Sequence, residues 1–203
     1  MRRLSIRVLA SVSVLTLALL TVLSACGARA VPFNLSNIDG LMPDLDFRMS
    51  DEKGHSVAGR DYAGQVVLLY FGYTRCPDAC PTTLVTLSQA IALLGEAGKH
   101  VRVLFVTVDP NRDTTAVLKQ YVTAFGPRFT GLRGSDESLS QLARRYRVAY
   151  RLEPADADGN YAVDHSSAVF IFDAHGRARL LAHANDTPKA VAADLTRLIS
   201  AGA

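Results

Sequence analysis

Two cysteines separated by three residues are the side chains in this sequence most able to do chemistry. Cys76 and Cys80 lie in the segment Gly72–Pro81, which reads Gly-Tyr-Thr-Arg-Cys-Pro-Asp-Ala-Cys-Pro. A lone close pair can be a metal site, a redox pair or a short disulfide. A disulfide closing so short a loop constrains the unfolded chain only slightly and therefore adds little stability. The spacing favours metal or redox chemistry over a structural bridge.

The expected setting of the pair is a tight loop that enters a helix, because Pro77 and Pro81 interrupt the segment. The helix N-terminus is expected to lower the thiol pKa and so to supply thiolate. Thiolates select Cu(I), Zn(II) or iron–sulfur clusters, whereas calcium and magnesium need oxygen ligands. Two thiolates leave a metal ion under-coordinated, so a third ligand is expected from elsewhere in the chain.

One histidine has a sequence context that suits this third ligand. The chain contains five histidines: His55, His100, His165, His175 and His183. His165 lies in Tyr161–Ser167, directly before a predicted strand over residues 168–172, where a loop can approach the cysteine segment. His55 and His175 fall in predicted turns and are expected to be solvated.

The elements that position these residues alternate between strand and helix. Gln65–Phe71 is a nearly continuous apolar run, typical of a strand buried on both faces. In chain order we expect a hairpin at 47–58, a strand at 65–71, a helix at 82–94, a strand at 101–108 and helices at 114–125 and 137–146. An extended piece at 148–152, a hairpin at 168–181 and a helix at 187–199 follow. Asp113 or Thr114 is the expected N-cap of the second helix.

This order predicts an α/β fold with a mixed central sheet flanked by helices on both faces and an N-terminal β-hairpin. A cysteine motif placed directly after the first buried strand, at a helix start, is the arrangement of thioredoxin-like domains. In such sheets the carboxyl ends of the strands usually carry the chemistry. The length of 203 residues suits one domain with a sizeable core.

The first 25 residues are expected to be a lipoprotein signal peptide. Arginines stand at positions 2, 3 and 7, and residues 8–25 carry no charge. Leu23-Ser24-Ala25-Cys26 resembles a bacterial lipobox, in which the cysteine is acylated and the preceding peptide is removed. An uncleaved membrane helix is the alternative, since eighteen apolar residues come near the ~20 needed for a span.

This interpretation makes residues 26–42 a lipidated tether and 43–203 the domain. The protein is then held at the cell membrane by Cys26, with its domain facing the periplasm. The chain has 22 Lys and Arg against 19 Asp and Glu, but three arginines and no acidic residue belong to the signal. The remainder is formally neutral, which gives no support to nucleic-acid binding.

Three motifs, in this order, resemble the Sco/SenC family of copper-binding proteins, which act in the assembly of cytochrome c oxidase. They are Gly72–Pro81, Val108–Thr114 (Val-Asp-Pro-Asn-Arg-Asp-Thr) and Val163–Ser166 (Val-Asp-His-Ser). The resemblance covers roughly residues 40–200. It implies a copper ion held by Cys76, Cys80 and His165.

The same resemblance suggests that Asp164 affects the metal site or a partner contact, although a loop carboxylate that accepts backbone hydrogen bonds is an equal alternative. Asp109, Arg112 and Asp113 are interpreted as a strand end, a turn and a helix cap rather than as ligands. Thr115 stands where family members often carry proline, a difference without functional weight.

The leading hypothesis is a copper metallochaperone, not an enzyme, that carries Cu(I) or Cu(II) to the copper-bearing subunit of cytochrome c oxidase. Other periplasmic copper carriers or thiol reductants are further expected partners. The alternative is a thiol–disulfide oxidoreductase in which Cys76 attacks a substrate disulfide and Cys80 resolves it. His165 discriminates between the two, because a simple dithiol exchanger does not need it. A peroxidase, with one activated cysteine and no histidine ligand, ranks lower.

Overall fold

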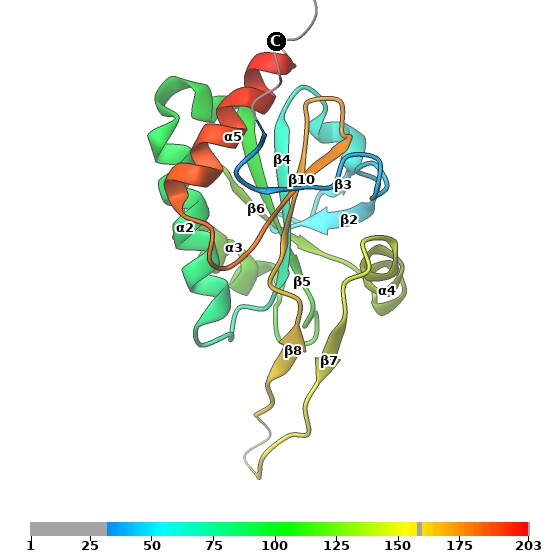
Figure 1. Cartoon of the computed structure of the whole chain (residues 1–203). Helices are drawn as coiled ribbons and strands as arrows, with labels where there is room; N and C mark the ends of the chain where they lie inside the picture. Colours follow the sequence, from blue (N-terminus) through cyan, green and yellow to red (C-terminus); the bar gives the residue numbers. More distant parts are fainter. Residues whose placement is uncertain (1–31, 158–159, 203) are drawn as a thin grey trace, which may run out of the picture. The chain divides into compact units, whose positions relative to one another are not determined.

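A mixed eight-stranded sheet forms the centre of the computed structural model, which describes residues 32–157 and 160–202 (Figure 1). Its order is β1-β10-β9-β4-β5-β6-β2-β3. The strands are β1 Ser36–Asn37, β2 Arg48–Asp51, β3 Ser56–Ala58, β4 Val66–Gly72, β5 Val101–Thr107, β6 Phe129–Arg133, β9 Val169–Phe172 and β10 Ala178–Ala182. The pairs β4–β5 and β5–β6 are parallel, and the others are antiparallel. The expected mixed sheet and the β2–β3 hairpin are confirmed.

Helices cover both faces of this sheet, as expected. α2 (Ala79–Leu93), α3 (Thr115–Thr123) and α5 (Pro188–Ala201) lie on one side, and α4 (Asp136–Arg145) lies on the other (Figure 1). Two short 3-10 helices, η1 (Gly59–Tyr62) and η2 (Gly95–His100), precede β4 and β5.

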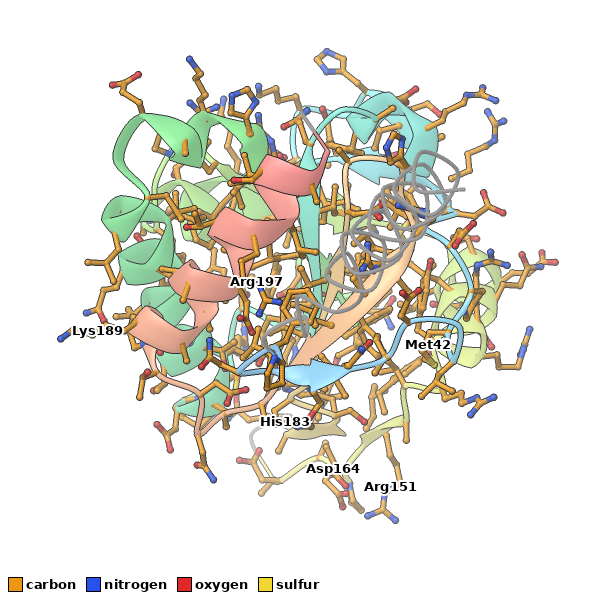
Figure 2. The ribbon with its side chains drawn as sticks, turned by 45° about the horizontal axis from the view of Figure 1, so that its top comes forward. Met42, Arg151, Asp164, His183, Lys189 and Arg197 are labelled. Carbon is orange, nitrogen blue, oxygen red and sulfur yellow. The ribbon has the colours of Figure 1, made fainter. Side chains whose placement is uncertain are left out.

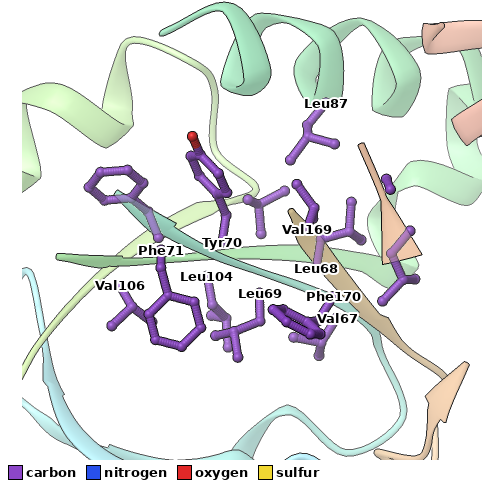
Figure 3. Close-up of a cluster of buried hydrophobic side chains, with 14 of the residues drawn as sticks. Val67, Leu68, Leu69, Tyr70, Phe71, Leu87, Leu104, Val106, Val169 and Phe170 are labelled. Carbon is purple, nitrogen blue, oxygen red and sulfur yellow. The ribbon is translucent and has the colours of Figure 1, made fainter. Parts of the chain in front are cut away.

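The core is built on β4, in which every residue is buried. Side chains of a strand alternate between its faces. Leu68 and Tyr70 point toward α2 and its Leu87, while Leu69 and Phe71 point to the opposite side (Figure 3). The apolar run therefore fills two layers at once, and its carboxyl end at Gly72 is held firmly where the cysteine segment begins.

A separate two-stranded sheet carries the histidine segment. β7 (Tyr150–Leu152) pairs antiparallel with β8 (Val163–His165), with His165 opposite Tyr150. These two strands, called here the β7–β8 ribbon, project from the end of the main sheet at which β4 and β5 finish (Figure 1). His165 therefore lies on a strand, whereas the sequence predicted a loop.

Two other expectations about elements were wrong. β6 was missed because Phe129–Arg133 contains Gly131 and two polar residues, a weak strand pattern that the parallel pairing with β5 overrides. α2 begins at Ala79, three residues earlier than expected. Pro81 is tolerated there because amide groups in the first helical turn have no intrahelical acceptor.

The helix caps follow the sequence more closely. Thr114 caps α3 by accepting a hydrogen bond from the Val117 amide at 3.3 Å, so of the two expected cap residues, Asp113 and Thr114, it is Thr114 that caps the helix. Thr187 caps α5, with Pro188 at the first helical position.

Part of the expected tether belongs to the folded domain. Residues 33–42 were assigned to the segment before the domain, but the packed unit begins at Phe33. β1 covers the free edge of β10, and Leu35 and Ile38 are buried. The predicted signal peptide and Cys26 lie outside the described residues. Among those that are described, the helices are all too short or too polar to span a bilayer.

A buried carboxylate holds this N-terminal segment to α5. Asp194 is fully buried and accepts hydrogen bonds from the Asn34 side chain at 2.9 Å and from the Leu35 amide at 2.8 Å. Besides its pairing with β10, the segment is thus held by one side chain that lies 159 residues beyond Leu35.

Replacing Asp194 with alanine is expected to lower the free energy of unfolding by about 1.5–3 kcal/mol, the usual range for hydrogen bonds to a charged group. Urea denaturation measures this loss, and hydrogen exchange should show faster exchange at the Leu35 amide. Lys189→Ala, an exposed change on the same helix, is the control. Unchanged exchange at Leu35 in Asp194→Ala would contradict the assignment.

Candidate metal centre

The cysteine loop starts where β4 ends and finishes inside the first turn of α2. Cys80, the second residue of α2, is fully buried, and Cys76 in the loop is partly exposed. The Cys76 amide donates to the Tyr73 carbonyl at 3.2 Å, which closes a turn. The Cys80 amide points at the Cys76 sulfur, 3.4 Å away. Both thiols are free, and the helix start directs a backbone donor toward Cys76.

His165 meets this loop from the β7–β8 ribbon. Its Nε2 lies 3.4 Å from the Cys80 sulfur, and its Nδ1 lies 3.0 Å from the Ser166 carbonyl. Because a carbonyl only accepts, Nδ1 is placed to donate to it, and in the neutral ring this leaves the lone pair of Nε2 facing the sulfur. The ring stands edge-on to Tyr73, with centroids 5.8 Å apart. The imidazole is thus oriented as a nitrogen ligand.

The structure brings all three predicted ligands together. The ligand atoms of Cys76, Cys80 and His165 lie within 4.8 Å of one another. Two sulfur donors and one imidazole nitrogen are a soft set that suits copper or zinc and excludes calcium and magnesium. The residues therefore fit the copper ion that the sequence resemblance implied, as a three-donor site.

Glycine at position 72 makes this approach of Cys80 to the sheet possible. A Cβ added there would lie 2.7 Å from a Phe105 ring carbon and 2.8 Å from the Cys80 sulfur. Real side chains do not approach so closely. The final residue of β4 therefore leaves room for the second thiol.

The thiol of Cys80 differs from the sequence expectation. Burial raises its pKa to about 12 and outweighs a hydrogen bond from Tyr70 that acts in the other direction. The predicted lowering by the helix N-terminus is wrong for this residue, because removal from water opposes the thiolate more strongly. A bound cation is what can replace its proton at neutral pH.

Asp113 has a role that the sequence did not show. Its buried carboxylate accepts hydrogen bonds from the Thr74 amide at 3.0 Å and from the Thr74 and Thr107 hydroxyls at 2.6 Å each. It thereby ties the cysteine loop to the end of β5. The interpretation of Asp113 as a helix cap was wrong. The sequence offered one signal for this: Thr114, directly after Asp113, can cap the helix itself, which leaves the Asp113 carboxylate available for another role.

The remaining candidates lie outside the ligand group. Asp164 is exposed, and its cross-strand neighbour in the ribbon is Arg151 (Figure 2). Because side chains alternate along a strand, Asp164 points to the opposite face of the ribbon from His165. His55 pairs with Asp51 at 3.2 Å, and His183 lies 3.3 Å from the Ser36 hydroxyl. Asp164 can thus reach a partner but does not join the metal ligands in this arrangement.

Gly72→Ala is expected to weaken copper binding about tenfold or more, the scale seen when the surroundings of a ligand are disturbed. The added methyl group must displace the Cys80 sulfur or the Phe105 ring. A competition titration with a copper chelator measures the affinity. Gly54→Ala is the control, because Gly54 is remote from the site. Its φ of 85° makes alanine unfavourable for the backbone, but an added methyl group there would meet only open space. An equal loss in both variants would show a general stability effect instead.

Comparisons with known proteins agree with this geometry. Residues 41–200 match the family model described as SCO1/SenC. The mitochondrial protein SCO2 homolog of Bos taurus is 47% identical over 133 residues, which cover 64% of this chain and 50% of the relative. The SCO2-like protein of Rickettsia felis is 35% identical over 147 residues and 72% of each chain. The chain thus spans about half the length of its bovine relative.

Solved structures extend the likeness to three dimensions. Copper-bound ScoI of Bradyrhizobium japonicum has 35% identity and a TM-score of 0.71, covering 76% of this chain and 98% of that one. The apo Sco1 protein of Thermus thermophilus has 38% identity and a TM-score of 0.74, covering 85% and 99%. These neighbours bear out the thioredoxin-like fold. With most of its length matched by the family model and its cysteine and histidine motifs joined at one site, the chain belongs to the SCO1/SenC family.

Proposed function

We propose that this protein binds copper through Cys76, Cys80 and His165 and delivers it to the copper-bearing subunit of cytochrome c oxidase. The convergence of these three ligand atoms within 4.8 Å carries the proposal. Relatives from Bradyrhizobium japonicum and yeast, 35% and 30% identical, bind copper, which supports copper over zinc. Membership of the SCO1/SenC family supports the recipient, because BsSco, a solved structural neighbour, is described as a member of the Sco family of cytochrome c oxidase assembly proteins.

The site suits transfer of a metal ion rather than turnover of a substrate. Three donors leave copper open to an incoming ligand, and Cys76 and His165 are the partly exposed members of the set. Cys80 must lose its proton when copper binds, because burial holds the pKa of its thiol near 12. Both thiols must also be reduced, so periplasmic thiol reductants and other copper carriers are the further partners of this function.

The second candidate is a thiol–disulfide oxidoreductase acting on periplasmic cysteines, including those of the oxidase subunit. The observation in its favour is the free thiol pair, with the more exposed Cys76 placed to attack and Cys80 to resolve. The oriented lone pair of His165 favours copper instead, because disulfide exchange between two cysteines has no use for it.

A copper titration of residues 27–203 with reduced thiols tests the leading proposal. We expect one copper per chain and, for Cu(II), a sulfur-to-copper charge-transfer band. Cys76→Ala, Cys80→Ala and His165→Ala should each weaken binding by more than about a hundredfold, since loss of an outer-shell partner alone costs about 10–100-fold.

His183→Ala is the matched control, because it removes an imidazole that lies against Ser36 instead of the cysteines. Unchanged copper affinity in His165→Ala, together with substantial disulfide reductase activity of the unmodified chain, would reject copper delivery and favour the oxidoreductase.

We infer that the protein works from the cell membrane, anchored by lipid on Cys26 with the domain facing the periplasm. The basic start, the uncharged run and Leu23-Ser24-Ala25-Cys26 support this inference. Acyl chains give stable anchoring when two or more are present, at roughly 0.8 kcal/mol for each buried CH₂.

Labelling of cells with radioactive palmitate should mark the unmodified protein and leave Cys26→Ser unlabelled. Protease added to spheroplasts should degrade the domain if it faces the periplasm. Cys76→Ser serves as the control for label on another thiol. Equal labelling of the Cys26→Ser protein would exclude Cys26 as the site of a lipid anchor.

A further inference from the structure

We propose that Arg112 is a positioning residue for His165: it clamps the β7–β8 ribbon to the end of the main sheet and so sets where the third ligand stands. This inference rests on the proposed copper site. It assigns a role to the Val108–Thr114 motif, which supplies no ligand to the Cys76–Cys80–His165 group.

Arg112 makes three different contacts at once. Its Nε donates to the carboxylate of Asp109, and its Nη1 donates to the Tyr161 carbonyl at 2.8 Å. Its guanidinium carbon lies 3.5 Å from the centroid of the Tyr161 ring. The Tyr161 hydroxyl in turn donates to Asp109 at 2.8 Å. The three residues form a closed set in which both the backbone and the ring of Tyr161 are held.

Burial makes this set costly to open. The side chain of Asp109 is fully buried, and that of Arg112 is 13% exposed. Removal of one partner from a buried ion pair leaves the other charge uncompensated, which destabilises the arrangement strongly. Tyr161 is therefore fixed to the turn that follows β5.

The clamp holds the outer end of the ribbon that carries the ligand, beyond the pair Leu152–Val163. Tyr161 precedes β8 by two residues, and β8 pairs with β7 rather than with any strand of the eight-stranded sheet. The position of the ribbon therefore depends on its chain connections to α4 and β9 and on side-chain contacts with Tyr161. Arg112 also lies 5.9 Å from the Tyr73 ring, whose edge-on neighbour is His165. A shift of Tyr161 moves β8, and with it the imidazole, relative to the cysteine loop.

Lysine cannot reproduce this clamp. The Arg112 side chain uses Nε, Nη1 and its planar face simultaneously, whereas an ammonium group is a single point charge without a stacking face. The chain also provides a matched arginine in the same region. Arg133 donates to the Pro110 carbonyl at 3.0 and 3.2 Å, so it is a second arginine bonded to the same turn, and these bonds do not involve Tyr161.

A double-mutant cycle in the full-length protein tests the proposal. Arg112→Ala should weaken copper affinity about 10–100-fold, as for other outer-shell partners, and should shift the Cu(II) charge-transfer band. In a His165→Ala background the same change should cause no further loss, because Arg112 acts through His165. Arg112→Lys should not restore binding, Tyr161→Phe should lose less than Arg112→Ala, and Arg133→Ala should keep the affinity of the unmodified protein.

A metal-free measurement separates this inference from the copper proposal. The Ser166 amide donates to the Ala149 carbonyl, and the Glu153 amide donates to the Ala162 carbonyl, so both report on the ribbon. Their hydrogen exchange should accelerate in Arg112→Ala and stay unchanged in Arg133→Ala. If copper does not bind through His165 at all, the exchange rates alone decide the clamp.

Equal losses of copper affinity from Arg112→Ala with and without His165 would overturn the positioning role. Unchanged exchange at Ser166 and Glu153 would overturn the clamp itself. Should Arg112→Ala fail to fold, Arg112→Lys and Tyr161→Phe give the same comparisons with smaller disturbance.

Discussion

The close approach of the Cys80 sulfur to the backbone of Gly72 is the contact on which the rest of the site depends. It places a ligand directly on the last residue of the most buried strand, against the Phe105 ring of the neighbouring strand. Cys80 is consequently a core residue and a metal ligand at the same time. The precision of the site on this side derives from close packing, because cores tolerate little displacement.

The three ligands are supported in different ways. The two cysteines are positioned by the main sheet and the first turn of α2, and Asp113 ties their loop to β5. The histidine stands on a ribbon that is hydrogen-bonded within itself and held to the turn after β5 by side-chain contacts at its outer end. The thiols thus form a fixed half of the site, and the imidazole forms a separately supported half. This division is compatible with the proposed delivery of copper, which requires that the ion be both held and released.

The sequence predicts well those features that depend on local pattern. The buried runs of β4 and β5, the caps of α3 and α5 and the cysteine loop follow from residue type and spacing. The nearness of His165 to the cysteines was foreseen through its place before β9, although its location on a strand was not. The lipid anchor at Cys26 lies outside the described residues and stays a prediction.

The features that were missed depend on partners distant in the chain. β6 is a strand because β5 lies beside it, and residues 33–38 are held by pairing with β10 and by Asp194. Asp113 is buried by Thr74 and Thr107, and the set of Asp109, Arg112 and Tyr161 joins residues about fifty positions apart. A polar residue that looks like a turn or a cap in one dimension becomes a buried support when a remote segment covers it.

The separation of the ligands along the chain has a consequence for the maturation of the protein. Cys80 and His165 are 85 residues apart, so the complete donor set exists only after β5, β6 and the β7–β8 ribbon have assembled. The unfolded chain offers copper two neighbouring thiols without the imidazole. Copper therefore binds the native state more tightly and stabilises it by mass action. Metal loading and resistance to unfolding are linked quantities, and the copper-free chain is the less stable of the two forms.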